Sequence, residues 1–278
     1  MNKTMHLISN AHLDPIWQWE WEEGCASAVA TFRCAARFCR EFDNYIFCHN
    51  EALIYRWVEE YDPTLFREIR ELVRLGKWHI MGGWHVQPDC NMPSGEAFVR
   101  QITEGRRYFR EKFGVEPTTA INFDPFGHTR GLVQILAGTG YDSYIFCRPH
   151  EGLCHLPAET FRWVGYDGSS VIAQRAQTGY STALGNAMKK IRPTTEALTD
   201  AAPLGFCLWG VGNHGGGPSR EDIRAINAFM EEAKAEGVTV LHSTPEAYFA
   251  DVRAETAAGT RVLPEHHGDL TAWAQGCY

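Results

Sequence analysis

The stretch His12-Leu13-Asp14 places an imidazole and a carboxylate one residue apart, directly after an apolar run. On an extended segment, two such side chains can point to the same side of the chain, which suits two ligands of one divalent ion. The pair can equally be a capping aspartate beside a packed histidine, because short motifs often match by chance. His12 and Asp14 are therefore candidate metal ligands, with helix capping as the alternative.

Asp124 is the second candidate for chemistry, because it lies between two aromatic residues where a buried strand is expected to end. Thr119 to Asn122 is predicted to form that short buried strand, and Pro125 and Gly127 interrupt it sharply. A carboxylate among aromatic rings is costly to desolvate without a cation, a donor or a proton. We therefore expect Asp124 to be both paired and functional, although it could also cap the following helix.

The glycine-rich run from Gly210 to Gly217 lacks the Lys-Ser/Thr that ends a phosphate-binding loop. We expect its glycines to let the backbone approach a ligand closely, with Asn213 and His214 as its polar side chains. His214 could contact a ligand or pack within the loop. His128, beyond the turn at Asp124, is expected to be structural.

Three tryptophans, Trp17, Trp84 and Trp209, are expected at or near strand ends. Their rings could stack on sugars, but tryptophan is also common at the edge of a core. Nine cysteines form an odd number without a Cys-x-x-Cys pair, and several lie in apolar segments. This pattern favours reduced core thiols and a cytoplasmic location.

Composition favours one large α/β domain of an ordinary globular protein, with 278 residues, 44% of them hydrophobic and 22% charged. A net charge of -8 without a basic run argues against a nucleic-acid partner and favours a small molecule. The segment Met1–Ser9 is too short and polar for a signal peptide, and no apolar run approaches the roughly 20 residues that span a bilayer.

Apolar runs predict strands that alternate with helices of three- and four-residue periodicity over nearly the whole chain. This alternation implies a mostly parallel sheet, rolled into a barrel or doubly wound, with its chemistry at the carboxyl ends of the strands. Asp167-Gly168 predicts a hairpin turn, and Ala254–Thr260 a loop of small residues. The expected strands are Met5–Ser9, Tyr45–Cys48, Trp78–Met81, Thr119–Asn122, Ser143–Cys147, Phe161–Val164, Val171–Ala173, Phe206–Trp209 and Thr239–Leu241.

Five motifs in order along the chain resemble the N-terminal catalytic domain of glycoside hydrolase family 38, the retaining α-mannosidases. Together they span Met5 to Pro218 and are more specific than any one of them. The motifs are His12-Leu13-Asp14-Pro15-Ile16-Trp17, Gly82-Gly83-Trp84, Pro88-Asp89-Cys90-Asn91-Met92-Pro93-Ser94-Gly95-Glu96, Asp124-Pro125-Phe126-Gly127-His128 and Gly210-Val211-Gly212-Asn213-His214-Gly215-Gly216-Gly217-Pro218.

The resemblance implies a seven-stranded, mostly parallel, barrel-like (β/α)7 domain that holds one zinc ion, although His and carboxylate ligands also accept other divalent ions. It implies His12, Asp14 and Asp124 as ligands, with Asp124 also acting as the nucleophile. It further implies that Arg148 orients Asp124. Substrate contacts are expected from Trp17, Trp84, Asp89 and His214.

Two departures from the family pattern concern the missing parts of this site. The position aligned with the family's fourth ligand is Ala272, so His214 or water would complete the metal shell. No carboxylate occurs at 178–182, where the family's general acid is expected, which leaves Asp89, Asp167 and Asp269 as candidates. Residues 1–278 are expected to form a single α/β catalytic domain, truncated from a longer multidomain enzyme.

The sequence thus predicts a metal-dependent retaining α-mannosidase domain acting on an oligosaccharide or α-mannoside. One alternative is a metal-dependent polysaccharide deacetylase, in which Asp124 would activate water. The other is an inactive carbohydrate-binding fragment, favoured by the missing acid and the early end of the chain.

Overall fold

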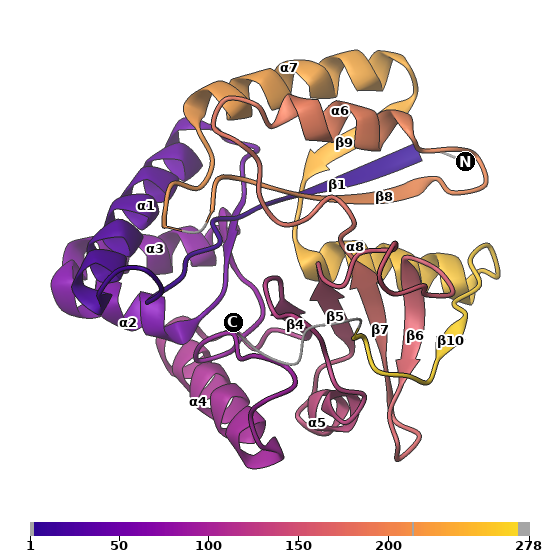
Figure 1. Cartoon of the computed structure of the whole chain (residues 1–278). Coiled ribbons are helices and arrows are strands. Elements are labelled where there is room, and N and C mark those ends of the chain that lie inside the picture. Colours follow the sequence, from indigo (N-terminus) through magenta and orange to yellow (C-terminus); the bar gives the residue numbers. More distant parts are fainter. Residues whose placement is uncertain (1–2, 213, 272–278) are drawn as a thin grey trace. The chain divides into compact units, whose positions relative to one another are not determined.

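The computed structural model describes residues 3–212 and 214–271 (Figure 1). The chain divides into two compact units, each assembled from segments that are distant in sequence. The first unit comprises Met1–His49, Leu53–His79 and Tyr180–Tyr248, and the second comprises Asn50–Ala52, Ile80–Gly179 and Phe249–Tyr278.

The first unit contains a five-stranded sheet around β1 (Lys3–Ser9). This strand pairs in parallel with β2 (Phe47–His49), β8 (Leu204–Trp209) and β9 (Val238–His242). The strand β3 (Trp78–Ile80) extends the sheet beyond β2. Because β1 is central, its residues from Met5 onward are buried, and the strand ends at Ser9, three residues before His12.

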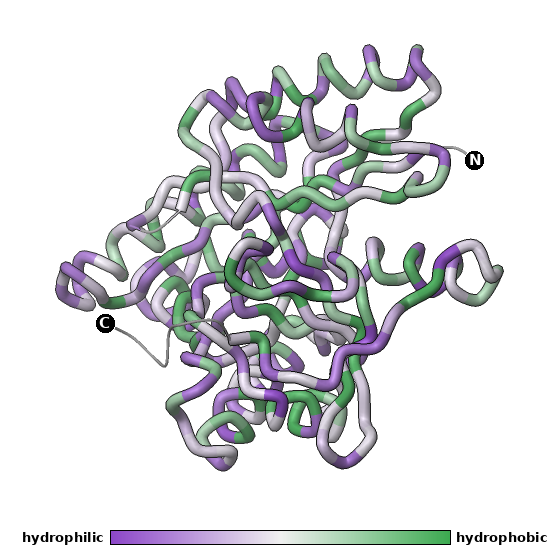
Figure 2. The backbone as a smooth tube through the Cα atoms, turned by 45° about the vertical axis from the view of Figure 1, so that its right-hand side comes forward, coloured by the Kyte–Doolittle hydropathy of each residue, from purple (hydrophilic) through white to green (hydrophobic). Residues whose placement is uncertain are grey.

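Helices cover this sheet. They are α1 (Trp21–Glu41), α2 (Ala52–Tyr61), α3 (Pro63–Arg74), α6 (Met188–Glu196) and α7 (Arg220–Ala235). Two of them, α3 and α7, begin with a side-chain cap. At α3, the Asp62 carboxylate accepts from the Leu65 N–H at 3.0 Å, and Pro63 occupies the first turn. In Figure 1, α7 runs beside β9. In Figure 2, α7 is the uppermost helix and alternates between hydrophilic and hydrophobic residues, as expected of a helix with one buried face.

The second unit contains another five-stranded sheet, with the order β10-β6-β7-β5-β4. Its strands are β4 (Thr119–Asn122), β5 (Ser143–Phe146), β6 (Thr160–Val164), β7 (Ser170–Arg175) and β10 (Glu265–His266). The pairs β4–β5, β5–β7 and β10–β6 are parallel, and β6–β7 is an antiparallel hairpin. Its helices are α4 (Gly95–Phe113) and α5 (Leu132–Gly138), while α8 (Pro245–Ala257) begins in the first unit and ends in the second.

The nine strand predictions are confirmed to within two residues at each end, and the hairpin turn at Asp167-Gly168 is confirmed. The predicted loop at Ala254–Thr260 is wrong over its first half, because α8 continues to Ala257. The helix α6 carries no sequence prediction. The fold is therefore mixed α/β with largely parallel pairing, and the described strands form two five-stranded sheets.

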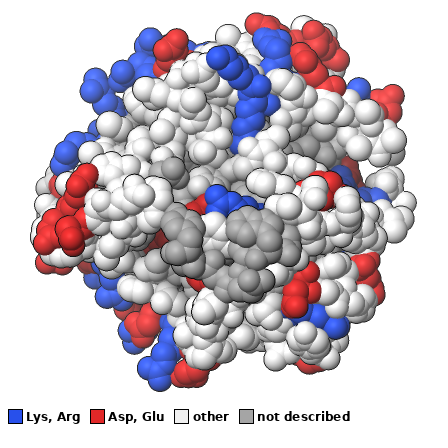
Figure 3. Space-filling view, in the orientation of Figure 1, with Lys and Arg blue, Asp and Glu red and all other residues white. Residues whose placement is uncertain are grey.

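The charge distribution on the surface concerns possible partners, and the state of the cysteines concerns the redox environment. On the face drawn in Figure 3, acidic and basic side chains are interspersed, without a continuous basic patch. Among the described residues, no helix is both long and apolar enough to cross a membrane. The eight described cysteines, at positions 25, 34, 39, 48, 90, 147, 154 and 207, form no disulfide, and Cys277 lies outside the described residues.

Candidate functional site

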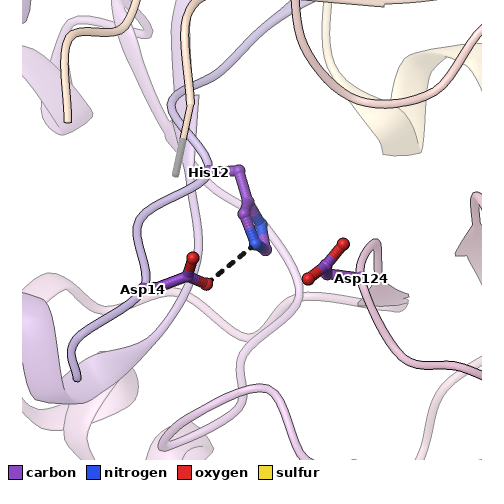
Figure 4. Close-up of side chains that lie close together, drawn as sticks. All are labelled: His12, Asp14 and Asp124. Carbon is purple, nitrogen blue, oxygen red and sulfur yellow. Dashed lines mark ion pairs between the residues drawn. The ribbon is translucent and has the colours of Figure 1, made fainter. Parts of the chain in front are cut away.

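His12 and Asp14 meet just beyond the carboxyl end of β1. His12 Nε2 and Asp14 Oδ1 lie 3.2 Å apart, as the dashed line in Figure 4 shows. Two ligand atoms held by one tetrahedral zinc ion at about 2.0–2.2 Å lie roughly 3.3–3.6 Å from each other. An imidazole N–H that donates to a carboxylate has nearly the same spacing. The geometry of the pair therefore fits either a shared ion or a shared proton.

The surroundings of His12 fix the orientation of its ring. The Tyr180 ring lies against it, with the two centroids 4.3 Å apart. The Asn10 amide donates to the carbonyls of Tyr180 and Trp209, both at 3.2 Å, and so joins the segment before His12 to the end of β8. His12 is 6% exposed and Asp14 is partly exposed, so solvent reaches the pair from the side of the Asp14 carboxylate.

The glycine-rich loop after β8 packs directly on this segment. A side chain at Gly210 would lie 1.9 Å from the Asn10 carbonyl oxygen, and one at Gly212 would lie 3.0 Å from His12 Cβ. Gly210 also has a φ of 123°, which side chains rarely allow. For these two glycines the close neighbour is the His12 segment of the same chain, and the expected approach to a ligand stays a prediction. Asn213 lies outside the described residues.

His214 contacts the first helix. Its Nε2 lies 2.7 Å from Glu23 Oε1, and its ring lies edge-on to that of Trp19, with the centroids 4.3 Å apart. His214 is about half exposed, and Glu23 is exposed as well. The sequence leaves open whether His214 contacts a ligand or packs within its loop. Its contacts in the structure are with Glu23 of α1 and with Trp19.

Asp124 and Arg148 form a second cluster of candidate residues, at the carboxyl ends of β4 and β5 in the second unit. Arg148 Nη1 donates to Asp124 Oδ1 at 2.8 Å and to the Asp124 carbonyl oxygen at 3.0 Å. The guanidinium carbon lies 4.8 Å from the centroid of the Phe126 ring. Both charged side chains are about one-third exposed, so the ion pair lies at the surface of the sheet edge. The expected pairing of Asp124 is therefore confirmed, with the Arg148 guanidinium as its partner.

Sequence reasoning missed two polar residues that hold the backbone before Asp124. The Phe123 N–H donates to Gln87 Oε1 at 2.8 Å, and the Gln87 N–H donates to Glu51 Oε1 at 2.9 Å. Glu51 is 3% exposed and is the one non-glycine residue in the described ranges with a positive φ, 69°. The signal available in the sequence was a run of polar residues, His49-Asn50-Glu51, directly after a strand.

His128 is buried beside the same loop. One ring nitrogen, Nδ1, lies 2.6 Å from Tyr144 Oη, and the other, Nε2, lies 2.8 Å from the Arg148 carbonyl oxygen. Burial lowers its pKa from about 6.5 to about 4, because the charged imidazolium is poorly solvated there. The structural role expected from the sequence agrees with this environment.

The three tryptophans expected to contact sugars differ in how far their rings are exposed to solvent. Trp17 is 46% exposed and can offer a ring face to a sugar. Trp84 is fully buried, and its Nε1–H donates to the Ile121 carbonyl at 2.9 Å. Trp209 is also fully buried. The expectation of sugar stacking by Trp84 is therefore corrected to a packing role, because its ring has no exposed face.

The three carboxylates considered as general acids have structural contacts. Asp89 Oδ1 accepts from the N–H groups of Asn91 and Met92, both at 2.8 Å. Asp167 lies in the exposed hairpin turn, where hydrogen bonds from Ser169 lower its pKa. That shift keeps Asp167 ionised, which is the wrong state for a proton donor at neutral pH. Asp269 is exposed and accepts from the Arg130 N–H at 2.6 Å.

Two further carboxylates surround the buried guanidinium of Arg175, at the end of β7. Glu159 accepts from it at 2.9 and 3.1 Å, and Glu151 accepts from the same group. Burial is the larger influence on the pKa of Glu159, and it raises that pKa. A forked ion pair of this kind stabilises the ionised carboxylate and anchors the loop after β5, so we interpret the cluster as structural.

Comparison with known proteins gives one consistent family. The chain is 27% identical to "Alpha-mannosidase G" of Dictyostelium discoideum over 98% of its own length and 24% of that protein. The structure of an alpha-mannosidase from Enterococcus faecalis aligns with a TM-score of 0.80 at 18% identity, over 96% of this chain and 31% of that one. A putative polysaccharide deacetylase from Mycobacterium smegmatis aligns with a TM-score of 0.62 at 12% identity, over 95% and 94% of the two chains.

The two structural likenesses show the fold alone, because their identities are low. The chain spans about a quarter of the length of the curated relatives that it matches over nearly all of its own length. Residues 2–276 match the family described as "Glycosyl hydrolases family 38 N-terminal domain". Since this match covers nearly the whole chain, the protein belongs to glycosyl hydrolase family 38, as its N-terminal domain.

Proposed function

We propose that this chain is the catalytic part of a metal-dependent, retaining α-mannosidase that acts on an oligosaccharide or a simpler α-mannoside. The observation that carries the proposal is the family match over residues 2–276. Support comes from the placement of His12 with Asp14 after β1, and of Asp124 with Arg148 after β4 and β5. Strand ends are where α/β enzymes place their reacting groups.

Joining these two halves into one metal site is part of the proposal. His12, Asp14 and Asp124 offer one imidazole nitrogen and two carboxylate oxygens, a donor set that zinc accepts. Other divalent ions accept the same donors. When bound, the ion would polarise sugar hydroxyls and stabilise the negative charge of the carboxylates. A seven-stranded barrel formed by one catalytic domain over residues 1–278 belongs to the same proposal.

The protein groups would divide the reaction as follows. The Asp124 carboxylate attacks the anomeric carbon and forms a covalent glycosyl ester, which water then hydrolyses with net retention. Arg148 holds that carboxylate in its ionised form and in one orientation through a charge-assisted hydrogen bond. The exposed ring of Trp17 stacks on the sugar, and Asp89 and His214 lie on the loops that would contact it. The proton donor to the leaving group is not assigned.

The labelling of Asp124 tests this proposal. A mechanism-based fluorinated mannoside with a dinitrophenolate leaving group, which leaves without protonation, should attach to Asp124 and be located by peptide mass spectrometry. Asp124→Asn should abolish labelling and lower kcat on dinitrophenyl α-mannoside by at least about 1,000-fold. The matched control, Asp167→Asn in the exposed hairpin turn, should retain both.

Two results would contradict the proposal. Labelling at another carboxylate would reassign the nucleophile. Release of acetate from an N-acetylated oligosaccharide, without any covalent sugar, would instead favour the deacetylase reading, for which the likeness in fold is the supporting observation.

A cytoplasmic location is a further part of the proposal, supported by the absence of disulfides among the eight described cysteines.

A further inference from the structure

Three residues of the stretch Asp124–His128 contact the same arginine. The Asp124 carboxylate and carbonyl accept hydrogen bonds from the Arg148 guanidinium, and the Phe126 ring lies 4.8 Å from its central carbon. His128 lies at the other end of Arg148, with Nε2 2.8 Å from its carbonyl oxygen. All of these residues belong to the second unit. The stretch therefore holds Arg148 at its backbone as well as at its charged end.

The hydrogen bonds of His128 define which of its nitrogens carries the proton. A carbonyl oxygen can only accept, so Nε2 must donate to Arg148. In the neutral ring Nδ1 is then an acceptor, and the Tyr144 hydroxyl, 2.6 Å away, must donate to it. Both side chains are fully buried, so water cannot replace either partner. Tyr144 thus selects the tautomer in which His128 can bind the Arg148 backbone.

This chain of contacts reaches the carboxylate that matters for the proposed reaction. A bond between one arginine nitrogen and Asp124 Oδ1 has a defined direction only if the arginine itself is anchored. The side chain of Arg148 is about one-third exposed, and without a fixed backbone it has rotamer freedom toward solvent. The buried hydrogen bond from His128 fixes the backbone from which this side chain extends, so the ion pair with Asp124 starts from one Cα position.

We propose that His128 and Tyr144 are positioning residues, which hold the backbone of Arg148 and thereby set the orientation of the Asp124 carboxylate. The proposal rests on the proposed function in one respect, since it assigns Asp124 the role of nucleophile and metal ligand. It adds two residues, neither of which touches substrate, whose effect passes through Arg148.

Three variants separate positioning from simple packing. His128→Leu removes the donor to Arg148, and Tyr144→Phe removes the group that selects the tautomer. His128→Gln keeps an amide N–H that can reach the Arg148 carbonyl. The matched control is His242→Leu in the first unit, which removes another buried histidine, hydrogen-bonded to Asn227.

We expect His128→Leu and Tyr144→Phe to lower kcat on dinitrophenyl α-mannoside, and the affinity for zinc, by about 10- to 100-fold each. KM should change little, because neither residue contacts substrate. His128→Gln should recover most of both values, and His242→Leu should lower the thermal midpoint without changing kcat per folded molecule. A loss of stability in all four variants, with kcat retained, would overturn the proposal in favour of packing alone.

A readout that needs no turnover distinguishes this proposal from the proposed function. In protein labelled with ¹⁵N-arginine, the guanidinium signals of Arg148, assigned with Arg148→Lys, should show slow rotation in the wild type because of the ion pair. His128→Leu and Tyr144→Phe should speed that rotation, whether or not the protein cleaves mannosides. Unchanged signals in both variants would overturn the positioning role, whereas changed signals without any mannosidase activity would refute only the function.

Discussion

Two buried histidines, His128 and His242, should make the folding stability of the protein fall at acidic pH. Burial lowers their pKa values from about 6.5 to about 4 and about 3. Between about pH 6.5 and each of these values, the unfolded chain binds a proton that the folded chain does not. The stability contributed by the neutral folded form is therefore complete above pH 6.5, and it is lost as the pH falls toward the folded pKa.

We expect the free energy of unfolding to fall as the pH drops from 7 to 5, by up to about 1.4 kcal/mol per pH unit for each histidine. Urea unfolding at pH 7, 6 and 5 measures this slope. His242→Gln should flatten the slope while lowering stability at pH 7, since a glutamine has no proton to gain. An equal slope in this variant would mean that other groups carry the pH dependence.

At the scale of single elements, α3 depends on the cap at its start. The Asp62 carboxylate accepts from the Leu65 N–H at 3.0 Å and also pairs with Arg33 at 2.8 Å. Asp62→Ala should lower the free energy of unfolding by about 1 kcal/mol, because the first turn loses its side-chain acceptor. Asp62→Asn keeps an acceptor and loses the charge, so it should cost clearly less. Thermal unfolding of both variants checks this prediction, and equal losses would assign the effect to the ion pair.

The helix α4 packs against the Gly82-Gly83-Trp84 segment through a glycine of its own. A side chain at Gly105 would lie 2.2 Å from the Gly83 carbonyl oxygen and 2.4 Å from the Trp84 carbonyl carbon. We therefore expect Gly105→Ala to destabilise the protein by about 1–3 kcal/mol or more, since backbone atoms must move. The control is Gly138→Ala at the end of α5, where a side chain would meet nothing within 4 Å. Similar midpoints for the two variants in urea unfolding would contradict the close packing.

At the scale of the whole molecule, the cysteines give a test of redox state. The eight described cysteines form no disulfide, and most of them are buried. Burial raises the pKa of Cys39 to about 12, and a thiol that stays protonated reacts slowly. Cys34 is exposed and should be modified first by a thiol reagent in the folded protein.

In denaturant, all nine cysteines should react, and a reductant should leave the thermal midpoint unchanged. Counting thiols by absorbance with and without denaturant measures both quantities. Fewer than nine reactive thiols in denaturant without reductant would show a disulfide and contradict the prediction. Cys34→Ser serves as the control, because it should remove the fast phase alone.

The strand positions and the candidate reacting residues could be predicted from the sequence, because they depend on local patterns. The short strand Thr119–Asn122 is followed by Pro125 and Gly127, which places Asp124 at a strand end whatever lies beside it. The pair His12 and Asp14 meets because their spacing is short. The caps at Asp62, Ser94 and Ser219 are equally local, because each side chain accepts from the backbone N–H three residues ahead.

The tertiary structure decided every feature that depends on a partner distant in sequence. The sequence suggests Trp84 as a ligand contact, but its ring is fully buried and its Nε1–H donates to the Ile121 carbonyl. The sequence suggests a structural role for His128, and only the structure shows its hydrogen bonds with Tyr144 and Arg148. The glycines at 210 and 212 are explained by the approach of residues 10–12, about two hundred positions earlier. Periodicity and capping act over a few residues, whereas burial and pairing depend on which segments the folded chain brings together, so the sequence could place these residues but not their partners.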